Sequence, residues 1–336
     1  MPGNIRLLVG GVKIEDFISY QVASDLFQAA DAFSFELSMP LHRNVSGLKC
    51  ELYVNDILEL TGIIDRENHK YDKGKNSYSI EGRDLMGLLV DSYCEEFPTL
   101  EGIELKALAE RLLKPFMSEI KKIEYGKGNK DRAVPLKNKK EEFESIKIQQ
   151  GQTVFEVLRD YALSRGLLFF SLPDGTLVFG EPATSGEAAF KLVCRKDGQG
   201  NNVIEGERVL DYSKRYSKVT VSGQTQDGKP VKDFVLDTDV KRHKPFIGQI
   251  EFDGQSPKKY ANILLNKQRF EGFQLRYKTD GHGQGSRNFQ VNSICHVKDE
   301  VFGLDENMLI YGRTFEMSKA GVFTTLKLSK LGVLPA

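Results

Sequence analysis

The pattern of hydrophobic and polar positions predicts short β-strands in the first part of the chain. Residues 33–38 read FSFELS, with an apolar side chain at every second position, which indicates a strand with one buried face. Residues 5–9 show the same spacing. The dipeptides at 10–11 (Gly-Gly) and 55–56 (Asn-Asp) separate such segments and favour tight hairpin turns. Short strands at this spacing are typical of a closed or nearly closed antiparallel barrel, which we place at residues 1–93.

Residues 146–181 predict a small α/β module. Thr153 and Glu156 lie three apart, just before a run with helical apolar spacing. This is the pattern of a capping box, in which the two side chains satisfy amides that the first helical turn leaves unpaired. We expect the helix to end near Gly166, because glycine readily adopts the left-handed conformation of helix ends. Two apolar strands follow, and the turn residues 173–175 are expected to join them as a hairpin.

Further helices and a β-rich C-terminal part complete the pattern. Asp84 is placed to cap a short helix, residues 105–116 are amphipathic, and Ser256-Pro257 has the cap and first-turn proline that begin a helix ending at Gly272. Residues 186–206 are expected to be rich in loops. The strands expected after them are 216–224, 273–279, 289–297, 308–316 and 322–328.

These elements predict an α+β protein that is mainly β. The C-terminal part repeats the short-strand character of the first part, although no residue-level repeat is visible. The predicted domains are an N-terminal β-barrel of residues 1–93, an α/β middle domain of residues 94–182 joined by 225–285, and a second β-barrel made of 183–224 and 286–336. Small α/β modules therefore lie between two tube-type antiparallel barrels.

Composition narrows the function classes. The 336 residues suffice for two or more domains, and 47 basic residues balance 47 acidic ones, so there is no global bias toward nucleic acid or an anionic membrane. Cys50, Cys94, Cys194 and Cys295 lie far apart, which favours buried free thiols in a reducing compartment, with a disulfide as the alternative. The N-terminus lacks an apolar signal core, and no run reaches membrane-spanning length. We therefore expect a soluble protein made in the cytosol, with no membrane span.

No stretch has the pattern of a catalytic, cofactor-binding or metal site, and we predict none. Residues 281–285 (GHGQG) resemble a phosphate loop, but a strand follows them where a helix is required, so a flexible hairpin loop is the better interpretation. The five histidines are mostly expected at the surface, and none has zinc-motif spacing. They are His42, His69, His243, His282 and His296. No G-x-S-x-G serine elbow is present.

Several charged segments carry weaker hypotheses. Glu95-Glu96 and the pair Asp237 and Asp239 are candidates for glycosidase carboxylates only in the sense that any acids are. Residues 237–239 could ligate a cation, or form a solvated loop. The basic residues 241–244 could touch an acidic partner, or simply be exposed. The lysines of 137–140, followed at once by two glutamates, favour a solvated loop over a nucleic-acid patch.

The segment 152–166 also has the character of a LysM-type glycan-binding repeat, with a Gly-x-Thr opening and a helix that holds a tyrosine. Such a module would bind peptidoglycan sugars in a shallow groove. The hairpin that follows stands where a LysM repeat has its second helix. A similarity of structure is therefore a better hypothesis than glycan binding itself.

Taken in order, the segments resemble the baseplate hub family of Mu-like contractile phage tails, the late control and tail hub proteins, and also the hub part of type VI secretion spike proteins. Seven landmarks carry the resemblance along nearly the whole chain. They are IRLLVGGVKI (5–14), FSFELSMP (33–40), LTGIID (60–65), EGRDLMGLLVDS (81–92), the stretch from IQQGQTVF to DGTLVF (148–179), YSKVTVSGQ (216–224) and NMLIYGRTFEMSKAGVFTTLKL (307–328).

The resemblance implies a structural, non-enzymatic protein of the virion tail baseplate, assembled in the cytoplasm of the bacterial host. Family members of this kind are homotrimers in which each subunit contributes two tube domains, and the resulting ring adapts the sixfold tail tube to the threefold central spike. The implied partners are the tail tube protein, the spike protein and other baseplate proteins, with DNA passing through the channel without specific binding. The alternative is a tail-associated protein that binds peptidoglycan or degrades the cell wall.

Overall fold

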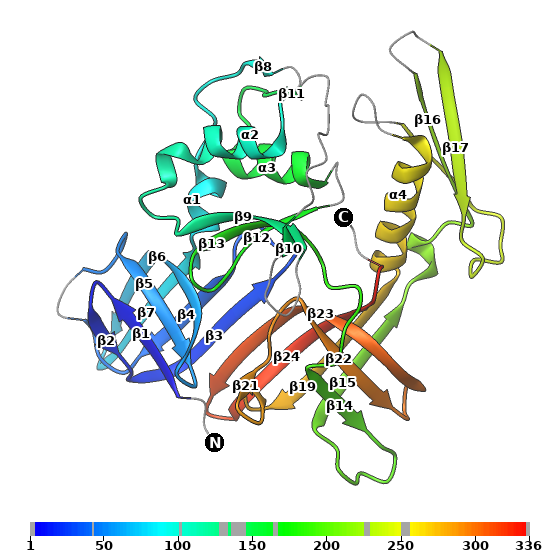
Figure 1. Cartoon of the computed structure of the whole chain (residues 1–336). Helices are drawn as coiled ribbons and strands as arrows, with labels where there is room; N and C mark the ends of the chain where they lie inside the picture. Colours follow the sequence, from blue (N-terminus) through cyan, green and yellow to red (C-terminus); the bar gives the residue numbers. More distant parts are fainter. Residues whose placement is uncertain are drawn as a thin grey trace.

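The computed structural model describes residues 4–41, 44–100, 103–127, 134–135, 146–163, 167–224, 229–249 and 256–333 (Figure 1). A large β-sheet runs through the molecule, and two smaller modules stand on the same side of it. The strands of the large sheet are β1 (Ile5–Val9), β2 (Val12–Ile14), β3 (Phe17–Asp25), β4 (Ala32–Leu37), β5 (Lys49–Val54), β6 (Ile57–Asp72), β7 (Lys75–Asp84), β14 (Phe190–Cys194), β15 (Val203–Leu210), β19 (Phe273–Asp280), β22 (Ser293–Asp299), β23 (Leu304–Ser318) and β24 (Gly321–Lys330).

The large sheet joins the two regions that the sequence predicts as separate barrels. Its strand order is β15-β19-β24-β23-β3-β4-β7-β6-β5-β1-β2, with β22 beside β23 and β14 beside β22. Apolar side chains from β1–β7 and from the C-terminal strands share one core. The predicted class, α+β and mainly β, is confirmed, and the two regions predicted as barrels are halves of one continuous sheet.

Local turn chemistry sets the N-terminal strands as predicted. The Gly10-Gly11 turn joins β1 to β2, and Asn55-Asp56 joins β5 to β6. Asn55 and Asp56 both adopt positive φ, at 51° and 61°, the conformation that a two-residue hairpin of type I′ requires at both central positions. Asp84 accepts a hydrogen bond from the amide of Met86 at 3.1 Å, and the short helix α1 (Met86–Asp91) begins there.

The middle module follows α1 and has its own core. It contains β8 (Thr99–Leu100), α2 (Leu105–Leu113), the 3-10 turn η1 (Lys114–Phe116), β9 (Lys122–Lys127), β10 (Val134–Pro135), β11 (Ile146–Lys147), α3 (Val154–Leu163), β12 (Leu168–Ser171) and β13 (Thr176–Glu181). The capping box is confirmed, because the Thr153 amide donates to Glu156 at 2.9 Å and the Glu156 amide donates to the Thr153 hydroxyl at 3.2 Å. The predicted β12–β13 hairpin is also present. The expected helix end at Gly166 lies outside the described residues.

A protruding module interrupts the C-terminal half of the sheet. It consists of the 3-10 turn η2 (Tyr212–Lys214), β16 (Lys218–Gln224), β17 (Pro230–Leu236), β18 (Pro245–Gln249) and α4 (Pro257–Glu271). β16 pairs with β17 and β18, and Val219 and Val221 pack against α4 in a separate core. The grouping differs from the one that the sequence predicts, because residues 218–249 and α4 form this module and Phe273–Asp280 belongs to the large sheet.

Two sequence expectations near this module are wrong. Residues 186–206 hold β14 and the start of β15 where loops are expected. β15 is exposed on both faces, so its sequence lacks the alternation that identifies a half-buried strand. The strand expected at 289–297 begins only at Ser293, because the preceding residues belong to a small hairpin of β20 (Gly283–Gln284) and β21 (Arg287–Asn288).

The capping box gives a stability prediction. Replacing Thr153 with Ala removes the hydroxyl that accepts from the Glu156 amide, and a lost N-cap of this kind costs about 1 kcal/mol of unfolding free energy. Urea denaturation of the purified protein measures this loss as a lower midpoint with an unchanged slope. Thr238→Ala, at an exposed loop position, is the control and should leave the midpoint unchanged. An unchanged midpoint for Thr153→Ala would contradict a stabilising role of the cap.

Candidate functional site

The junction between the two halves of the large sheet is the site with the most specific chemistry. β23 pairs with β22 through Leu304–Ile310 and with β3 through Gly312–Met317, and the register shifts between these two stretches at Tyr311. The carbonyl of Tyr311 accepts from the amide of Leu26 at 2.9 Å. A β-bulge lets a strand bend and change direction. β23 therefore has two successive partners on one edge, one in each half of the sheet.

A buried ion pair lies beneath this strand exchange. Arg313 of β23 donates through Nη2 to Glu59 of β6, and their side chains are 4% and 3% exposed. Arg313 also donates to the carbonyl of Phe289. Asn288 Nδ2 donates to Glu59 Oε1 at 2.7 Å and to the carbonyl of Val54 at 2.8 Å. Two charges far from water are stable only when paired and hydrogen-bonded in good geometry, so the pair fixes how the halves meet.

A second polar chain crosses the same junction. The hydroxyl of Tyr20 in β3 lies 2.7 Å from Nε2 of His282, and His282 Nδ1 lies 3.1 Å from the hydroxyl of Thr324 in β24. The Thr324 hydroxyl donates to the carbonyl of Gly281 at 2.6 Å. Burial, with Arg313 nearby, lowers the pKa of His282 to about 4. The neutral ring then accepts from Tyr20 and donates through Nδ1 to Thr324, so every group in the chain has a partner.

The middle module is attached to the junction through buried carboxyl groups. Asp84, which is 5% exposed, accepts from the hydroxyl of Ser171 in β12. Its amide donates to the carbonyl of Asp31 at 2.9 Å. Burial raises the pKa of Asp84 to about 8, and the nearby Asp31 carboxylate adds to the rise. Asp25, next to them on β3, pairs with Lys327 of β24 at 2.9 Å. Acidic side chains thus link all three parts of the chain.

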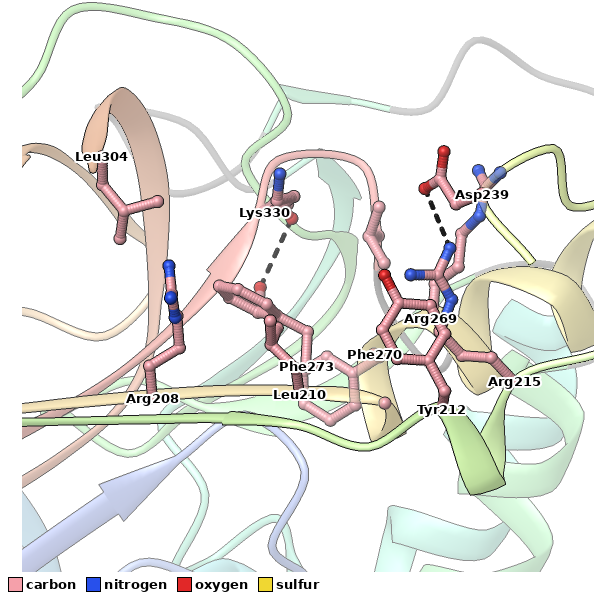
Figure 2. Close-up of a pocket in the computed structure, with 13 residues that line it drawn as sticks. Arg208, Leu210, Tyr212, Arg215, Asp239, Arg269, Phe270, Phe273, Leu304 and Lys330 are labelled. Carbon is pink, nitrogen blue, oxygen red and sulfur yellow. Dashed lines mark hydrogen bonds and ion pairs between the residues drawn. The ribbon is translucent and has the colours of Figure 1, made fainter. Parts of the chain in front are cut away.

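A cavity of about 370 Å³ lies where the end of β15, η2, the end of α4 and the end of β24 meet (Figure 2). Cationic and apolar side chains line it. The cations are Arg208, Arg215, Arg269 and Lys330, and the apolar residues include Leu210, Phe270, Phe273 and Leu304. A pocket of this size with convergent charges is a candidate for an anionic ligand.

Carboxylates of the chain already pair with three of the four cations of this cavity, and Arg208 donates to the carbonyl of Phe302 at 2.7 Å. Arg215 contacts Asp237 at 2.8 Å and Asp239 at 2.9 Å, and Arg269 contacts Asp237 at 3.0 Å. Burial alone would raise the pKa of Asp237, but the guanidiniums of Arg269 and Arg215 hold it below its ordinary value. Lys330 lies 3.5 Å from Glu306. The geometry therefore supports ion pairs that hold η2, the end of β17 and α4 together within the protruding module, rather than a ligand site.

The charged segments that the sequence singles out do not come together. Asp237 is buried and forms ion pairs with Arg215 and Arg269, so the expectation of a solvated loop at 237–239 is wrong for this residue. Glu95 and Glu96 lie exposed in the middle module, and Glu96 pairs with Arg111 at 2.6 Å. In the tract 241–244, Lys244 lies over the ring of Tyr216. The lysines of 137–140 lie outside the described residues.

The histidines and cysteines follow the expectation with two exceptions, His282, which is buried, and Cys194, which is only partly buried. His69 and His243 are exposed and His296 is partly exposed, but His282 is 2% exposed and belongs to the junction. The hairpin that contains it is anchored as well, because Gln284 Nε2 donates to the carbonyl of Lys191 at 2.6 Å. The predicted free thiols are confirmed at all four cysteines. Burial raises the pKa of Cys50 and of Cys295 to about 12.

Two further findings concern metal and membrane. Within the described ranges, no group of three or more His, Cys, Asp or Glu side chains is placed to hold a metal ion. None of the helices found there is long and apolar enough to cross a membrane. The tyrosine of the LysM-like segment, Tyr161, is 3% exposed and its hydroxyl donates to the carbonyl of Ile103. Its ring is thus part of the core of the middle module and is not available to stack on a sugar.

Comparison with known proteins identifies the family. The Mu phage baseplate assembly protein GpP-like N-terminal family matches residues 4–84, and the baseplate hub protein gp44-like second-domain family matches residues 86–181. Together they cover just over half of the chain. The chain belongs to the baseplate hub proteins of Mu-like phage tails. The resemblance inferred from the seven landmarks is therefore confirmed.

Relatives of this hub protein match most of its length. The baseplate hub protein gp44 of Escherichia phage Mu is 23% identical over 264 residues, which are 74% of this chain and 65% of the relative. The tail protein from Neisseria meningitidis MC58 is 28% identical, with a TM-score of 0.87 over 99% of this chain and 98% of the other. The 43 kDa tail protein of prophage MuSo2 from Shewanella oneidensis has the same fold, with 24% identity and a TM-score of 0.81 over 98% and 99% of the two chains.

The fold likeness extends to type VI secretion. An E. coli protein described as a component of that system has a TM-score of 0.58 and 11% identity over 96% of this chain and 76% of the other. At this identity the likeness concerns the fold alone. It agrees with the similarity to spike hubs that the sequence suggests.

The junction residues are the part that sequence reasoning does not find. Glu59, Asn288 and Arg313 are spread across the chain, and only Arg313 lies within one of the seven landmarks, where nothing marks it as a member of an ion pair. The one available signal is a charge among apolar neighbours, as in LIYGRTF around Arg313. A buried charge in a strand requires a partner, but the partner lies 254 residues away and only the fold supplies it.

Removing one member of the buried ion pair should destabilise the hub protein strongly. Arg313→Met leaves the Glu59 carboxylate buried without its cation, and such a break costs about 3–5 kcal/mol of unfolding free energy. Urea denaturation measures the loss. Arg6→Met, which breaks the exposed Arg6–Asp56 pair, is the control and should cost less than about 1 kcal/mol. The double variant Glu59→Leu, Arg313→Met should be less destabilised than Arg313→Met alone, and equal costs for the two single arginine variants would refute this account.

The raised pKa of Asp84 should make the unfolding free energy of the protein depend on pH. Between its ordinary value of 3.8 and its folded value of about 8, the native state holds a proton that the unfolded chain does not, so stability falls as pH rises through this window. Asp84→Asn is permanently neutral and should gain unfolding free energy relative to wild type from about pH 5 to about pH 9, by roughly 1.4 kcal/mol for each unit of pKa difference. Chemical denaturation across this pH range measures the gain.

Asp174→Asn is the control for this series. Burial raises the pKa of Asp174, but hydrogen bonds from Lys121 and Thr176 lower it below its ordinary value. Its carboxylate is therefore ionised in both states across the same range, and the difference between this variant and wild type should stay constant. A constant difference for Asp84→Asn would show that Asp84 is ionised in the folded protein.

Proposed function

We propose that the chain is the structural hub of a contractile phage or prophage tail, and that three copies close into a ring which adapts the sixfold tail tube to the threefold spike. The observation that carries the proposal is the continuous sheet, in which two tube-like halves are held at one fixed angle by β23 and by the Glu59–Arg313 pair. A ring of three such chains presents six tube-like units. Membership of the baseplate hub family supports the same role.

The ends of the sheet supply the means of closing the ring. Among the described residues, β15 pairs only with β19 and β2 pairs only with β1. Ile204 and Val209 of β15 are 58% and 39% exposed, and Val12 of β2 is 47% exposed. An open strand edge is a template for pairing with another chain. Pairing of β15 in one copy with β2 of the next is a heterologous contact, which closes into a ring when the rotation between copies is the right one.

The remaining features of the proposal follow from this role. The tail tube, the spike and other baseplate proteins are its partners, DNA passes through the bore without specific binding, and assembly takes place in the host cytoplasm. The protein acts through contacts and not as an enzyme. We place the first tube-like domain at 1–93 and the middle domain at 94–182. We assign the second tube-like domain to β14, β15, β19 and β22–β24, since these strands complete the other half of the sheet.

Mass measurement of the purified protein in solution tests the ring. Native mass spectrometry should give a trimer, and electron microscopy should show a particle with a central channel. Ile204→Lys together with Val209→Lys adds charge to the edge of β15 and should shift the protein toward monomer, by the mechanism that protects natural edge strands. Tyr71→Lys, at a side chain that is 81% exposed on β6, is the matched control. A wild-type monomer at all accessible concentrations would exclude the proposed ring.

A further inference from the structure

The small sheet of the protruding module has two faces of different character. Helix α4 covers one face, where Val219 and Val221 of β16 pack against Tyr260, Ala261 and Leu265. In Figure 1, α4 lies on the side of this sheet that is turned toward the middle module.

Results

Sequence analysis

The pattern of hydrophobic and polar positions predicts short β-strands in the first part of the chain. Residues 33–38 read FSFELS, with an apolar side chain at every second position, which indicates a strand with one buried face. Residues 5–9 show the same spacing. The dipeptides at 10–11 (Gly-Gly) and 55–56 (Asn-Asp) separate such segments and favour tight hairpin turns. Short strands at this spacing are typical of a closed or nearly closed antiparallel barrel, which we place at residues 1–93.

Residues 146–181 predict a small α/β module. Thr153 and Glu156 lie three apart, just before a run with helical apolar spacing. This is the pattern of a capping box, in which the two side chains satisfy amides that the first helical turn leaves unpaired. We expect the helix to end near Gly166, because glycine readily adopts the left-handed conformation of helix ends. Two apolar strands follow, and the turn residues 173–175 are expected to join them as a hairpin.

Further helices and a β-rich C-terminal part complete the pattern. Asp84 is placed to cap a short helix, residues 105–116 are amphipathic, and Ser256-Pro257 has the cap and first-turn proline that begin a helix ending at Gly272. Residues 186–206 are expected to be rich in loops. The strands expected after them are 216–224, 273–279, 289–297, 308–316 and 322–328.

These elements predict an α+β protein that is mainly β. The C-terminal part repeats the short-strand character of the first part, although no residue-level repeat is visible. The predicted domains are an N-terminal β-barrel of residues 1–93, an α/β middle domain of residues 94–182 joined by 225–285, and a second β-barrel made of 183–224 and 286–336. Small α/β modules therefore lie between two tube-type antiparallel barrels.

Composition narrows the function classes. The 336 residues suffice for two or more domains, and 47 basic residues balance 47 acidic ones, so there is no global bias toward nucleic acid or an anionic membrane. Cys50, Cys94, Cys194 and Cys295 lie far apart, which favours buried free thiols in a reducing compartment, with a disulfide as the alternative. The N-terminus lacks an apolar signal core, and no run reaches membrane-spanning length. We therefore expect a soluble protein made in the cytosol, with no membrane span.

No stretch has the pattern of a catalytic, cofactor-binding or metal site, and we predict none. Residues 281–285 (GHGQG) resemble a phosphate loop, but a strand follows them where a helix is required, so a flexible hairpin loop is the better interpretation. The five histidines are mostly expected at the surface, and none has zinc-motif spacing. They are His42, His69, His243, His282 and His296. No G-x-S-x-G serine elbow is present.

Several charged segments carry weaker hypotheses. Glu95-Glu96 and the pair Asp237 and Asp239 are candidates for glycosidase carboxylates only in the sense that any acids are. Residues 237–239 could ligate a cation, or form a solvated loop. The basic residues 241–244 could touch an acidic partner, or simply be exposed. The lysines of 137–140, followed at once by two glutamates, favour a solvated loop over a nucleic-acid patch.

The segment 152–166 also has the character of a LysM-type glycan-binding repeat, with a Gly-x-Thr opening and a helix that holds a tyrosine. Such a module would bind peptidoglycan sugars in a shallow groove. The hairpin that follows stands where a LysM repeat has its second helix. A similarity of structure is therefore a better hypothesis than glycan binding itself.

Taken in order, the segments resemble the baseplate hub family of Mu-like contractile phage tails, the late control and tail hub proteins, and also the hub part of type VI secretion spike proteins. Seven landmarks carry the resemblance along nearly the whole chain. They are IRLLVGGVKI (5–14), FSFELSMP (33–40), LTGIID (60–65), EGRDLMGLLVDS (81–92), the stretch from IQQGQTVF to DGTLVF (148–179), YSKVTVSGQ (216–224) and NMLIYGRTFEMSKAGVFTTLKL (307–328).

The resemblance implies a structural, non-enzymatic protein of the virion tail baseplate, assembled in the cytoplasm of the bacterial host. It also implies a homotrimer in which each subunit contributes two tube domains, and the resulting ring adapts the sixfold tail tube to the threefold central spike. The implied partners are the tail tube protein, the spike protein and other baseplate proteins, with DNA passing through the channel without specific binding. The alternative is a tail-associated protein that binds peptidoglycan or degrades the cell wall.

Overall fold

The computed structural model describes residues 4–41, 44–100, 103–127, 134–135, 146–163, 167–224, 229–249 and 256–333 (Figure 1). A large β-sheet runs through the molecule, and two smaller modules stand on the same side of it. The strands of the large sheet are β1 (Ile5–Val9), β2 (Val12–Ile14), β3 (Phe17–Asp25), β4 (Ala32–Leu37), β5 (Lys49–Val54), β6 (Ile57–Asp72), β7 (Lys75–Asp84), β14 (Phe190–Cys194), β15 (Val203–Leu210), β19 (Phe273–Asp280), β22 (Ser293–Asp299), β23 (Leu304–Ser318) and β24 (Gly321–Lys330).

The large sheet joins the two regions that the sequence predicts as separate barrels. Its strand order is β15-β19-β24-β23-β3-β4-β7-β6-β5-β1-β2, with β22 beside β23 and β14 beside β22. Apolar side chains from the N-terminal and the C-terminal strands share one core. The predicted class, α+β and mainly β, is confirmed, and the two regions predicted as barrels are halves of one continuous sheet.

Local turn chemistry sets the N-terminal strands as predicted. The Gly10-Gly11 turn joins β1 to β2, and Asn55-Asp56 joins β5 to β6. Asn55 and Asp56 both adopt positive φ, at 51° and 61°, the conformation that a two-residue hairpin of type I′ requires at both central positions. Asp84 accepts a hydrogen bond from the amide of Met86 at 3.1 Å, and the short helix α1 (Met86–Asp91) begins there.

The middle module follows α1 and has its own core. It contains β8 (Thr99–Leu100), α2 (Leu105–Leu113), the 3-10 turn η1 (Lys114–Phe116), β9 (Lys122–Lys127), β10 (Val134–Pro135), β11 (Ile146–Lys147), α3 (Val154–Leu163), β12 (Leu168–Ser171) and β13 (Thr176–Glu181). The capping box is confirmed, because the Thr153 amide donates to Glu156 at 2.9 Å and the Glu156 amide donates to the Thr153 hydroxyl at 3.2 Å. The predicted β12–β13 hairpin is also present. The expected helix end at Gly166 lies outside the described residues.

A protruding module interrupts the C-terminal half of the sheet. It consists of the 3-10 turn η2 (Tyr212–Lys214), β16 (Lys218–Gln224), β17 (Pro230–Leu236), β18 (Pro245–Gln249) and α4 (Pro257–Glu271). β16 pairs with β17 and β18, and Val219 and Val221 pack against α4 in a separate core. This grouping differs from the predicted one, because β16–β18 and α4 form a module of their own and β19 belongs to the large sheet.

Two sequence expectations near this module are wrong. Residues 186–206 hold β14 and the start of β15 where loops are expected. β15 is exposed on both faces, so its sequence lacks the alternation that identifies a half-buried strand. The strand expected at 289–297 begins only at Ser293, because the residues before it follow a small hairpin of β20 (Gly283–Gln284) and β21 (Arg287–Asn288).

The capping box gives a stability prediction. Replacing Thr153 with Ala removes the hydroxyl that accepts from the Glu156 amide, and a lost N-cap of this kind costs about 1 kcal/mol of unfolding free energy. Urea denaturation of the purified protein measures this loss as a lower midpoint with an unchanged slope. Thr238→Ala, at an exposed loop position, is the control and should leave the midpoint unchanged. An unchanged midpoint for Thr153→Ala would contradict a stabilising role of the cap.

Candidate functional site

The junction between the two halves of the large sheet is the site with the most specific chemistry. β23 pairs with β22 through residues 304–310 and with β3 through residues 312–317, and its register shifts between these stretches at Tyr311. The carbonyl of Tyr311 accepts from the amide of Leu26 at 2.9 Å. A β-bulge lets a strand bend and change direction. β23 therefore has two successive partners, one in each half of the sheet.

A buried ion pair accompanies this strand exchange. Arg313 of β23 donates through Nη2 to Glu59 of β6, and their side chains are 4% and 3% exposed. Arg313 also donates to the carbonyl of Phe289. Asn288 Nδ2 donates to Glu59 Oε1 at 2.7 Å and to the carbonyl of Val54 at 2.8 Å. Two charges far from water are stable only when they are paired and hydrogen-bonded in good geometry, so the pair fixes how the halves meet.

A second polar chain crosses the same junction. The hydroxyl of Tyr20 in β3 lies 2.7 Å from Nε2 of His282, and His282 Nδ1 lies 3.1 Å from the hydroxyl of Thr324 in β24. The Thr324 hydroxyl donates to the carbonyl of Gly281 at 2.6 Å. Burial, with Arg313 nearby, lowers the pKa of His282 to about 4. The neutral ring then accepts from Tyr20 and donates through Nδ1 to Thr324, so every group in the chain has a partner.

The middle module is attached to the junction through buried carboxyl groups. Asp84, which is 5% exposed, accepts from the hydroxyl of Ser171 in β12. Its amide donates to the carbonyl of Asp31 at 2.9 Å. Burial raises the pKa of Asp84 to about 8, and the nearby Asp31 carboxylate adds to the rise. Asp25 of β3 pairs with Lys327 of β24 at 2.9 Å. Acidic side chains thus link all three parts of the chain.

A cavity of about 370 Å³ lies where the end of β15, η2, the end of α4 and the end of β24 meet (Figure 2). Cationic and apolar side chains line it. The cations are Arg208, Arg215, Arg269 and Lys330, and the apolar residues include Leu210, Phe270, Phe273 and Leu304. A pocket of this size with convergent charges is a candidate for an anionic ligand.

Carboxylates of the chain already pair with three of the four cations of this cavity, and Arg208 donates to the carbonyl of Phe302 at 2.7 Å. Arg215 contacts Asp237 at 2.8 Å and Asp239 at 2.9 Å, and Arg269 contacts Asp237 at 3.0 Å. Burial alone would raise the pKa of Asp237, but the guanidiniums of Arg269 and Arg215 hold it below its ordinary value. Lys330 lies 3.5 Å from Glu306. The geometry therefore supports ion pairs that hold η2, the end of β17 and α4 together within the protruding module, rather than a ligand site.

The charged segments that the sequence singles out do not come together. Asp237 is buried and forms an ion pair with Arg215, so the expectation of a solvated loop at 237–239 is wrong for this residue. Glu95 and Glu96 lie exposed in the middle module, away from the acids of the protruding module. In the tract 241–244, the ammonium of the last lysine lies 4.2 Å from the centre of the Tyr216 ring. The lysines of 137–140 lie outside the described residues.

The histidines and cysteines follow the expectation with two exceptions, His282, which is buried, and Cys194, which is only partly buried. His69 and His243 are exposed and His296 is partly exposed, but His282 is 2% exposed and belongs to the junction; His42 lies outside the described residues. The hairpin that holds His282 is anchored, because Gln284 Nε2 donates to the carbonyl of Lys191 at 2.6 Å. All four cysteines are free, as predicted. Burial raises the pKa of Cys50 and of Cys295 to about 12.

Three further findings concern metals, membranes and glycans. Within the described ranges, no group of three or more His, Cys, Asp or Glu side chains is placed to hold a metal ion. None of the helices found there is long and apolar enough to cross a membrane. The tyrosine of the LysM-like segment, Tyr161, is 3% exposed and its hydroxyl donates to the carbonyl of Ile103. Its ring is part of the core of the middle module, so it cannot stack on a sugar.

Comparison with known proteins identifies the family. The Mu phage baseplate assembly protein GpP-like N-terminal family matches residues 4–84, and the baseplate hub protein gp44-like second-domain family matches residues 86–181. Together they cover just over half of the chain. The chain belongs to the baseplate hub proteins of Mu-like phage tails. The resemblance inferred from the seven landmarks is therefore confirmed.

Relatives of this hub protein match most of its length. The baseplate hub protein gp44 of Escherichia phage Mu is 23% identical over 264 residues, which are 74% of this chain and 65% of the relative. The tail protein from Neisseria meningitidis MC58 is 28% identical, with a TM-score of 0.87 over 99% of this chain and 98% of the other. The 43 kDa tail protein of prophage MuSo2 from Shewanella oneidensis has the same fold, with 24% identity and a TM-score of 0.81 over 98% and 99% of the two chains.

The fold likeness extends to type VI secretion. An E. coli protein described as a component of that system has a TM-score of 0.58 and 11% identity over 96% of this chain and 76% of the other. At this identity the likeness concerns the fold alone. It agrees with the similarity to spike hubs that the sequence suggests.

The junction residues are the part that sequence reasoning does not find. Glu59, Asn288 and Arg313 are spread across the chain, and only Arg313 lies within one of the seven landmarks, where nothing marks it as a member of an ion pair. The available signal is a charge among apolar neighbours, as in LIYGRTF around Arg313. A buried charge in a strand requires a partner, but the partner lies 254 positions away and only the fold supplies it.

Removing one member of the buried ion pair should destabilise the hub protein strongly. Arg313→Met leaves the Glu59 carboxylate buried without its cation, and such a break costs about 3–5 kcal/mol of unfolding free energy. Urea denaturation measures the loss. Arg6→Met, which breaks the exposed Arg6–Asp56 pair, is the control and should cost less than about 1 kcal/mol. The double variant Glu59→Leu, Arg313→Met should be less destabilised than Arg313→Met alone, and equal costs for the two single arginine variants would refute this account.

The raised pKa of Asp84 should make the unfolding free energy of the protein depend on pH. Between its ordinary value of 3.8 and its folded value of about 8, the native state holds a proton that the unfolded chain does not, so stability falls as pH rises through this window. Asp84→Asn is permanently neutral and should gain unfolding free energy relative to wild type from about pH 5 to about pH 9, by roughly 1.4 kcal/mol for each unit of pKa difference. Chemical denaturation across this pH range measures the gain.

Asp174→Asn is the control for this series. Burial raises the pKa of Asp174, but hydrogen bonds from Lys121 and Thr176 bring it below its ordinary value. Its carboxylate is therefore ionised in both states across the same range, and the difference between this variant and wild type should stay constant. A constant difference for Asp84→Asn would instead show that Asp84 is ionised in the folded protein.

Proposed function

We propose that the chain is the structural hub of a contractile phage or prophage tail, and that three copies close into a ring which adapts the sixfold tail tube to the threefold spike. The observation that carries the proposal is the continuous sheet, in which two tube-like halves are held together by β23 and by the Glu59–Arg313 pair. A ring of three such chains presents two tube-like units from each. Membership of the baseplate hub family supports the same role.

The ends of the sheet supply the means of closing the ring. Among the described residues, β15 pairs only with β19 and β2 pairs only with β1. Ile204 and Val209 of β15 are 58% and 39% exposed, and Val12 of β2 is 47% exposed. An open strand edge is a template for pairing with another chain. Pairing of β15 in one copy with β2 of the next is a heterologous contact, which closes into a ring when the rotation between copies is the right one.

The remaining features of the proposal follow from this role. The tail tube, the spike and other baseplate proteins are its partners, DNA passes through the bore without specific binding, and assembly takes place in the host cytoplasm. The protein acts through contacts and not as an enzyme. We place the first tube-like domain at 1–93 and the middle domain at 94–182. We assign the second tube-like domain to β14, β15, β19 and β22–β24, since these strands complete the other half of the sheet.

Mass measurement of the purified protein in solution tests the ring. Native mass spectrometry should give a trimer, and electron microscopy should show a particle with a central channel. Ile204→Lys together with Val209→Lys adds charge to the edge of β15 and should shift the protein toward monomer, by the mechanism that protects natural edge strands. Tyr71→Lys, at a side chain that is 81% exposed on β6, is the matched control. A wild-type monomer at all accessible concentrations would exclude the proposed ring.

A further inference from the structure

The small sheet of the protruding module has two faces of different character. Helix α4 covers one face, where Val219 and Val221 of β16 pack against Tyr260, Ala261 and Leu265. In Figure 1, α4 lies on the side of this sheet that is turned toward the middle module. The other face, which we call the outward face, is turned away from the rest of the chain, and the strand register determines which residues share it.

The outward face is apolar and cationic. Three rows cross it, namely Leu236–Lys218–Pro245, Phe234–Thr220–Ile247 and Lys232–Ser222–Gln249. Phe234, Leu236 and Ile247 are 47%, 57% and 74% exposed, and Lys218 Nζ lies 4.2 Å from the centre of the Phe234 ring. The rows contain two lysines and no carboxylate. An exposed apolar patch rimmed by polar groups marks an interaction site, and the lysines select an acidic partner surface.

A surface of complementary chemistry lies in the middle module, in the segment 91–97 between α1 and β8. Tyr93 and Phe97 are 65% and 48% exposed, and Glu95 and Glu96 lie exposed between them. Two acids of the segment already have intramolecular partners, Asp91 with Arg83 of β7 and Glu96 with Arg111 of α2. No such pair engages Glu95 among the described residues. The segment therefore offers aromatic rings beside an exposed carboxylate.

The outward face and the segment 91–97 lie at opposite ends of the folded molecule. Figure 1 shows the middle module and the protruding module on the same side of the large sheet, with the middle module above the N-terminal strands and the protruding module beyond the C-terminal strands. The outward face of a chain is thus turned away from its own segment 91–97. A surface at one end that complements a surface at the other end generates a head-to-tail contact between copies.

We propose that the outward face of β16–β18 in one copy docks on the segment 91–97 of the next copy. This inference rests on the proposed ring and names a contact within it. Phe234, Leu236 and Ile247 pack against Tyr93 and Phe97 of the neighbour, and Lys218 and Lys232 face its glutamates. The contact joins the same two ends of the chain as the pairing of β15 with β2, so both form together when the ring closes.

Cross-linking between two variants that each carry one introduced cysteine tests the contact. Ile247→Cys and Phe97→Cys are purified separately, mixed, allowed to exchange subunits and oxidised. A disulfide-linked dimer containing one copy of each variant is expected. Ile247→Cys mixed with Tyr71→Cys, whose side chain is 81% exposed on β6, is the control and should give no such product. The native cysteines Cys50, Cys94 and Cys295 are buried, which limits their part in the reaction, and the partly exposed Cys194 is replaced by Ser in every variant.

Charge reversal gives an independent readout. Lys218→Glu and Glu95→Lys should each raise the dissociation constant of the trimer, measured by sedimentation, by about tenfold, which corresponds to roughly 1.4 kcal/mol. The double variant should recover most of this loss, because it restores opposite charges across the interface. Both positions are at the surface, and thermal unfolding of each variant checks that the fold is intact.

The outcomes separate this inference from the proposed function. A wild-type trimer that gives no 247–97 cross-link, or whose dissociation constant is unchanged in both charge variants, overturns the contact and leaves the ring in place. A wild-type monomer overturns the ring and the contact with it. The expected cross-link, together with rescue in the double variant, supports both.

Discussion

The pairing of β3 with β23 is the constraint on which the rest of the structure depends. Without it the large sheet would be two separate half-sheets, because the described strands of each half otherwise pair among themselves. β23 connects the halves because its pairing partner changes from β22 to β3 at Tyr311, so that one strand belongs to both halves. Backbone hydrogen bonds alone would tolerate a slip in register. The buried Glu59–Arg313 pair removes that freedom, since a slipped strand would leave both charges unpaired away from water.

The same reasoning explains why so many polar groups are buried in a protein with no catalytic role proposed for it. A buried ion pair adds little net stability compared with an apolar core of the same shape, but it strongly disfavours alternatives in which its partners separate. The Tyr20–His282–Thr324 chain and the Asp84–Ser171 contact act in the same way, each tying a side chain of one part to another part. For a subunit of the proposed ring, a single fixed arrangement of the parts of the chain matters more than a small gain in unfolding free energy.

The sequence predicts local structure well and long-range polar contacts poorly, for a physical reason. The Thr153–Glu156 capping box and the Asn55-Asp56 turn are each formed by residues at most three positions apart. Their sequence pattern can therefore be recognised without knowing the fold. β15 is missed because an edge strand exposed on both faces has no alternation. His282 is taken for a surface residue because its loop is rich in glycine, while the groups that bury it, Tyr20 and Thr324, are far away in the sequence.

Closure of the proposed ring depends on the geometry of the whole subunit and not only on its interfaces. A heterologous contact closes only when each copy is rotated by the same fixed amount relative to the last, and otherwise it continues into an open filament. That rotation is the sum of the geometry at the two ends and the angle between the two halves of the sheet. A flexible joint between the halves would spread the angle and admit open assemblies. In the proposed ring, the junction at β23 is therefore as much a part of assembly as the proposed contacts themselves, because it directs the exposed apolar residues at the two ends of the molecule toward each other.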